Sequence, residues 1–147
     1  MGMYTELIFG ASLKEDTPTQ VIMILEHMTK EDFSGEPLPK EVLPKHPFFS
    51  IDGWQWLFQC SSYYFGVCDS STVFKKCRSG RNYILSTRSS IKNYEGEIEA
   101  FLNWIKPYCQ QGSGERHMIA IVTYEEGMPV LHYLKEEASE QDLEEDY

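Results

Sequence analysis

Six cationic side chains cluster in the middle of the sequence, in a stretch that has no carboxylate. Between residues 70 and 94 the chain carries Lys75, Lys76, Arg78, Arg81, Arg88 and Lys92. They are nearly half of the 13 Lys and Arg residues of a chain whose formal net charge is −10. If strand pairing brings Lys75, Arg78, Arg81 and Arg88 onto one surface, we expect that surface to bind a phosphate, a nucleotide or an acidic protein. The alternative is a charged sheet surface or edge that prevents aggregation.

The sequence shows no constellation for catalysis or metal binding. The four histidines (His27, His46, His117, His132) and the four cysteines (Cys60, Cys68, Cys77, Cys109) do not follow the spacing of zinc ligands. No nucleophile elbow, Walker A loop or dinucleotide fingerprint is present. We therefore predict a protein that is not an enzyme, with no catalytic residue, no metal site and no cofactor. The cysteines are expected to be reduced thiols, with Cys60 in the core.

Aromatic side chains are dense just before the cationic stretch. Residues 54–65 contain Trp54, Trp56, Phe58, Tyr63, Tyr64 and Phe65. One buried face cannot absorb all of them, so we expect some to contact a protein partner. The residues predicted to bind that partner are Trp54, Tyr63, Tyr64, Arg78, Arg81 and Arg88. The six cations, Lys75, Lys76, Arg78, Arg81, Arg88 and Lys92, form the alternative site for a small anion.

Two segments have the apolar periodicity of helices. Val21, Ile24, Leu25 and Met28 recur at helical spacing. They follow Thr17, the predicted N-cap, with Pro18 at the first helical position and Gln20 completing a capping box. The second helix is predicted over residues 95–106, where Ile98, Phe101, Leu102 and Ile105 form the stripe. Asn93 is its predicted cap and Pro107 ends it.

Strand patterns surround the two helices. They lie at residues 3–13, 54–60, 72–77, 82–91, 117–124 and 130–134, with a hairpin turn at 78–81. The predicted order is β-α-β-β-β-α-β-β. We therefore expect an α+β fold, a two-layer sandwich in which two helices cover one face of a mostly antiparallel sheet of five or six strands.

The remaining segments set the domain boundaries. Pro37, Pro39, Pro44 and Pro47 exclude regular structure in residues 33–53, which form either a packed cover or a binding loop. Residues 136–147 hold seven acids and no base. We predict one domain over residues 1–134 and a disordered acidic tail over 135–147.

Composition also limits the expected partners and location. The sequence has neither a signal peptide nor an apolar run long enough to span a membrane, so we expect a cytoplasmic protein without a membrane partner. The negative net charge disfavours nucleic acid. The expected partner is another protein, of unknown identity, or a second copy in a homodimer joined through a sheet edge or exposed aromatic residues.

Several short strings together resemble those of a known, loosely defined group. They are Met3–Glu6, Leu13–Pro18, Ser62–Phe65, Ile91–Glu95, Glu97–Ile98, Phe101–Ile105 and Tyr124–Glu126 with Pro129. The chain resembles short proteins of phage, prophage and bacterial genomes, a group with no assigned activity. The likeness covers most of residues 3–134. It implies an accessory or inhibitor protein of a phage or mobile element and carries no site residue across.

Overall fold

The computed structural model describes residues 4–30, 38–111 and 117–134, so the predicted acidic tail lies outside the described residues. The helices are α1 (Thr19–Met28) and α2 (Glu97–Ile105). The strands are β1 (Thr5–Ser12), β2 (Val73–Lys76), β3 (Tyr83–Ile91), β4 (Met118–Thr123) and β5 (Val130–Tyr133). Four short 3₁₀ turns complete the order: η1 (Lys40–Val42), η2 (Pro47–Ser50), η3 (Trp54–Trp56) and η4 (Lys106–Tyr108).

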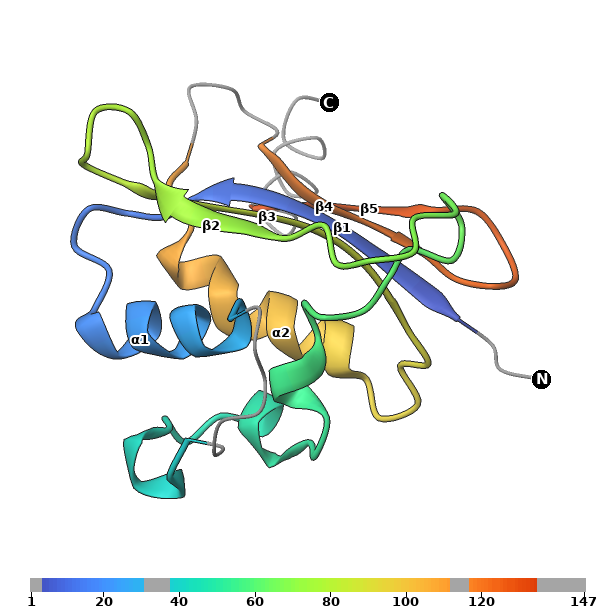
Figure 1. The fold of residues 1–147 in the computed structure, drawn as a ribbon, viewed down its shortest axis with the longest axis horizontal. Helices are drawn as coiled ribbons and strands as arrows, with labels where there is room; N and C mark the ends of the chain where they lie inside the picture. The colour runs from blue at the N-terminus through green and yellow to red at the C-terminus, as the bar shows by residue number, and fades with distance from the viewer. Residues whose placement is uncertain (1–3, 31–37, 112–116, 135–147) are drawn as a thin grey trace, which may run out of the picture.

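The five strands form one sheet in the order β2-β3-β1-β4-β5, with every neighbouring pair antiparallel. Both helices lie on the same side of this sheet, as Figure 1 shows. The predicted α+β sandwich is therefore confirmed. We call the sheet surface turned away from the helices the outer face.

The period of two along β1 separates the two faces of the sheet. Leu7 and Phe9 are buried on the helix side, opposite Val122 and Ala120 of β4. The intervening residues Glu6, Ile8 and Gly10 therefore point to the outer face. The central strand thus places a glutamate, Glu6, on the side that no helix covers.

The apolar stripes of both helices pack against the sheet as predicted. Val21, Ile24, Leu25 and Met28 are buried on α1, and Ile98, Phe101, Leu102 and Ile105 are buried on α2. Their burial removes two continuous apolar surfaces from water, which is the main stabilising term in such a sandwich.

The predicted capping box of α1 does not form. The hydroxyl of Thr17 donates to Lys14 O at 2.6 Å, and the N-cap residue is Pro18. The side chain of Gln20 donates instead to Val42 O at 2.6 Å and ties α1 to η1. In α2, Gly96 is the N-cap, and Asn93 accepts a hydrogen bond from the Ile98 N–H at 2.9 Å.

The prediction of a strand over residues 54–60 is wrong. The segment begins with η3, and the Leu57 N–H donates to Trp54 O at 3.4 Å. Trp54, Leu57 and Phe58 are the buried side chains, which is helical spacing. The alternation of aromatic and polar residues misled the prediction because Trp56, one of the apolar positions, faces solvent.

The described part of the proline-rich segment, residues 38–53, packs on the body of the protein. Phe48 is fully buried among Trp54, Phe101 and Trp104, with ring centroids 5.7–6.0 Å apart. This segment therefore extends the core beyond the two helices, as a packed cover does.

Candidate binding surface

The segment Ser62–Val67, here called the aromatic loop, is held against the outer face near the ends of β1 and β3. A bridge between Ser62 and Val67 closes it, with their N–H groups and carbonyls paired at 3.0 Å in both directions. The Ser90 N–H of β3 donates to Ser61 O at 3.0 Å just before the loop begins. The loop is thus tied to the sheet by backbone hydrogen bonds.

Glu6 lies beneath this loop and organises it. Its side chain is only 1% exposed, and one carboxylate oxygen accepts hydrogen bonds from the hydroxyls of Ser62 and Ser90. The two hydroxyls in turn accept from the N–H groups of Phe65 and Tyr63, at 3.2 and 3.0 Å. The second carboxylate oxygen, Oε2, is buried and has no partner among the described residues. Glu6 therefore connects β1, β3 and the backbone of the aromatic loop.

Three aromatic side chains of the loop remain in solvent. Tyr63 is 66% exposed, Phe65 55% and Tyr64 40%. The ring of Tyr63 stacks on Tyr4 with centroids 5.3 Å apart, and the Tyr64 hydroxyl donates to Tyr4 O at 2.7 Å. The rings are therefore exposed yet held in place, so binding a partner costs little side-chain entropy.

Arg88 lies beside these rings on the outer face. Its guanidinium carbon is 4.4 Å from the centroid of the Phe65 ring, which is the geometry of a cation–π contact. Its Nε is buried and makes no hydrogen bond with any described residue. We call Tyr4, Tyr63, Tyr64, Phe65 and Arg88 together the aromatic surface.

The structure brings only three of the six predicted partner-binding residues to this surface. Tyr63, Tyr64 and Arg88 belong to it. Trp54 was expected to be exposed, but it is only 6% exposed and packs against Phe48 and Phe49, so it is not available to a partner. Arg78 and Arg81 lie in the turn between β2 and β3, and Arg88 is seven positions beyond Arg81, roughly 23 Å along an extended chain.

The six cations do not converge on one anion site. Lys75 and Arg88 share the outer face, roughly 13 Å apart along β3, because Lys75 pairs with Ile84. Lys76 is on the opposite face, with its Nζ 5.6 Å from the Tyr83 ring centroid. Lys92 comes directly after β3, at the end of the strand opposite to the turn that holds Arg78 and Arg81. Strand pairing therefore does not gather all six charges at one place on the sheet.

Three members of the aromatic surface or its support were not among the predicted site residues. In the sequence, Tyr4 and Glu6 belong only to a strand pattern, and Phe65 belongs only to an aromatic-rich segment. The alternation of that strand places Glu6 on its polar face, but the burial of Glu6 follows from the loop that covers it. Only the register Glu6–Ser90 brings that carboxylate to the serine hydroxyls.

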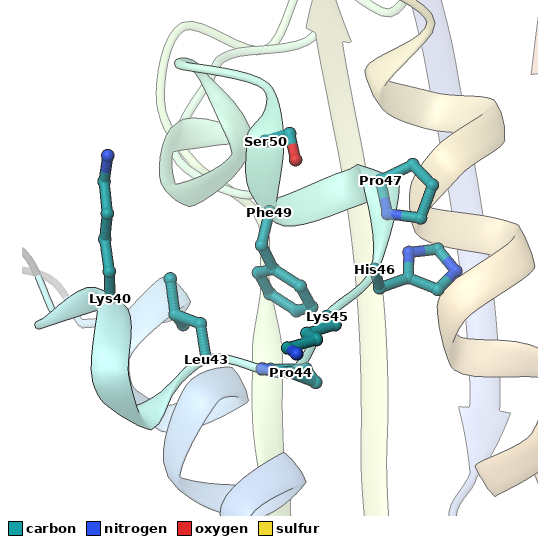
Figure 2. A pocket seen from close by; sticks show the side chains of 8 residues that line it. All are labelled: Lys40, Leu43, Pro44, Lys45, His46, Pro47, Phe49 and Ser50. Carbon is teal, nitrogen blue, oxygen red and sulfur yellow. The ribbon is translucent and has the colours of Figure 1, made fainter.

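A separate hollow of about 730 Å³ lies on the proline-rich segment. Figure 2 shows it between η1 and η2, with the Phe49 ring between Leu43 and Lys45. Lys40 and Lys45 also line it, and none of its lining residues is acidic. The ring of His46 is engaged: its Nδ1 accepts from the Phe48 N–H at 3.1 Å and its Nε2 lies 3.2 Å from Asn103 Oδ1. None of the six cations of the basic stretch lines this hollow.

The four cysteines are free thiols with different environments. Cys109, not Cys60, is the buried one, and burial raises the pKa of its thiol to about 12. Cys77 is partly exposed, and the Ser79 hydroxyl 2.9 Å from its Sγ lowers its pKa to about 7.

Within the described ranges, no group of three or more His, Cys, Asp or Glu side chains is placed to hold a metal ion.

Comparison of the chain with protein-family models, with curated proteins and with solved structures finds no match. In the part of the chain that the structure describes, neither helix has the length and apolar character needed to cross a bilayer.

Proposed function

We propose that this chain is a small, non-enzymatic protein-binding module, and that a partner protein docks on the aromatic surface. The observation that carries the proposal is the fixed exposure of Tyr63, Tyr64 and Phe65 beside Arg88. Tyr and Arg are the residue types that dominate binding energy at protein interfaces. An accessory or inhibitor role for a phage or mobile element is the biological setting that we propose for it.

The construction of the surface supports recognition rather than chemistry. The rings of Tyr63 and Tyr64 are held by Tyr4, and the backbone of the loop is held by Glu6 through two serine hydroxyls. Glu6 is buried beneath the loop and so cannot act on a solvent-borne substrate. A rigid aromatic patch around a cation is suited to a partner that offers apolar and acidic or carbonyl groups.

A pull-down with a matched control tests this function. Tagged wild-type protein is incubated with bacterial lysate beside a Tyr63→Ala/Tyr64→Ala variant and a Tyr94→Ala variant. Tyr94 is 71% exposed and lies outside the aromatic surface. We expect wild type and Tyr94→Ala to retain a partner, which mass spectrometry identifies. The double variant should retain at least about tenfold less of that partner. Failure to retain any partner or to self-associate, or equal loss in both variants, contradicts the proposal.

The alternative function, binding of a small anion through residues 75–92, is not favoured by this arrangement because the six cations are dispersed. A thermal-shift screen distinguishes the two functions. A nucleotide that raises the melting temperature of wild type, with the gain lost in an Arg81→Ala/Arg88→Ala variant, supports the anion site instead.

A further inference from the structure

The two edges of the sheet differ in their protection. β2, at one edge, carries Lys75 and Lys76, both exposed. β5, at the other edge, has the sequence Val-Leu-His-Tyr, with no Lys, Asp, Glu or Pro. Exposed edge strands in soluble proteins are usually blocked by charged side chains, because their free backbone groups pair with other chains. β2 carries such charged side chains, and β5 does not.

The backbone of β5 offers hydrogen-bonding groups at Leu131 on the side that faces away from β4. The Leu134 N–H donates to His117 O at 2.8 Å, so residues at even positions turn their N–H and C=O groups toward β4. By alternation, the N–H and C=O groups of Leu131 point away from the sheet. Among the described strands, none pairs with this side of β5.

The side chains around this edge are apolar and exposed. The exposed large hydrophobic residues include Met128, Val130 and Leu131 of the β4–β5 hairpin and Met118 at the start of β4. On the outer face, Leu131 continues a row formed by Ile8 and Ile121, which are its successive neighbours across β1 and β4. An added strand would therefore extend an existing apolar row.

Charge identifies the kind of strand that fits. Residues 124–147 contain nine acids and a single base, Lys135, so this stretch holds most of the net charge of −10. Glu125 and Glu126 are exposed just before β5, and Glu136 and Glu137 follow it closely in the sequence. A second copy of the chain would bring these like charges together, whereas Lys or Arg at the ends of a partner strand would be attracted to them.

We propose that the edge of β5 that faces away from β4 binds, at Leu131, an extended segment of a partner protein by strand addition, and that this segment has an alternating apolar core flanked by Lys or Arg residues. Main-chain hydrogen bonds to Leu131 supply the pairing. Contacts with Leu131 and Met118 select apolar side chains at alternate positions of the partner. Leu131 and Met118 are not members of the aromatic surface, so the proposal does not depend on the function proposed for that surface.

A short fluorescent peptide of alternating Val and Thr with two Lys at each end tests the proposal. Its binding to the full chain is measured by anisotropy, beside a control peptide in which Glu replaces each Lys. Two variants are compared, Leu131→Lys on β5 and Val73→Lys on β2. Both replaced side chains are 45% exposed and lie on the outer face of an edge strand, so the variants differ only in which edge gains the charge.

We expect wild type and Val73→Lys to bind the Lys peptide alike, and Leu131→Lys to bind it at least about tenfold more weakly. Binding should weaken as salt is raised to about 0.5 M. Hydrogen exchange should slow at the Leu131 amide when the peptide is bound. No binding to wild type, equal loss in both variants, or no protection of Leu131 overturns the proposal. A concentration-dependent dimer of wild type that Leu131→Lys abolishes overturns it in favour of a second copy.

Discussion

Glu6 shows how one residue determines the shape of a surface to which it does not itself belong. A buried carboxylate is stable only when hydrogen bonds compensate for its lost hydration. Here the compensation comes from the hydroxyls of Ser62 and Ser90, one from the loop and one from β3. Because both hydroxyls also accept from loop N–H groups, the conformation of the aromatic loop depends on this carboxylate.

Cys77 gives a prediction at the same scale. Its pKa is lowered to about 7 by the Ser79 hydroxyl and by backbone N–H groups, whereas burial raises the pKa of Cys60 and raises that of Cys109 to about 12. Because the thiolate is the reactive form, iodoacetamide should alkylate Cys77 before those two thiols. Its rate should fall roughly tenfold between about pH 8 and about pH 6.

Peptide mass spectrometry of briefly treated, folded protein measures these rates. Ser79→Ala should raise the pKa of Cys77 and move the midpoint of its rate profile to higher pH. A Cys77 that reacts no faster than Cys60 contradicts the predicted thiolate.

At the scale of elements, the described part of the proline-rich segment serves as a third packing layer beside the two helices. η2 places Phe48 in the core, and the Phe48 ring stacks on Trp104 of α2 with an interplanar angle of 22°. Pro47 begins this turn without breaking it, because its missing N–H is not needed in the first turn of a 3₁₀ helix. The hollow beside Lys40 and Lys45 is on the outside of the same segment.

Phe48→Ala tests this structural role. Removing a fully buried ring should lower the free energy of unfolding by about 3–5 kcal/mol, because a cavity remains among Trp54, Phe101 and Trp104. The matched control is Phe65→Ala, in which an exposed ring is removed and the loss should be about 1 kcal/mol or less. Urea unfolding of both variants measures the difference. Equal losses would show that the segment is not part of the core.

At the scale of the whole molecule, charge is distributed unevenly. The acids concentrate around and after β5, whereas the cations are spread over β2, the β2–β3 turn, β3 and the position after it. The sheet therefore has a cationic edge and an edge flanked by acids. Such an asymmetry orients the approach of charged partners before any contact forms.

Removal of residues 136–147 tests this distribution. The truncation changes the formal net charge from −10 to −3. Because the sequence predicts a disordered tail, the melting temperature followed by circular dichroism should change by less than about 3 °C. The association rate of the Lys-flanked peptide should fall at low salt and be nearly unaffected at high salt. A drop in melting temperature of more than about 5 °C would mean that the tail packs on the fold.

Both helices, five of the six predicted strands and the fold class could be predicted from the sequence. These depend on local periodicity, and the stripe Ile98, Phe101, Leu102, Ile105 can be recognised without knowing its partners. Periodicity is misleading at 54–60, because aromatic and polar residues alternate there although the buried side chains, Trp54, Leu57 and Phe58, have helical spacing.

Only the tertiary structure decided which side chains meet. The cations are neighbours in sequence, but an extended hairpin separates Arg81 from Arg88 and turns Lys75 and Lys76 to opposite faces. Conversely, Glu6 meets Ser62 and Ser90 across more than 50 residues because of one strand register. Short-range patterns specify which elements form, whereas the register and the packing of distant segments decide which of their side chains are buried, exposed or brought together.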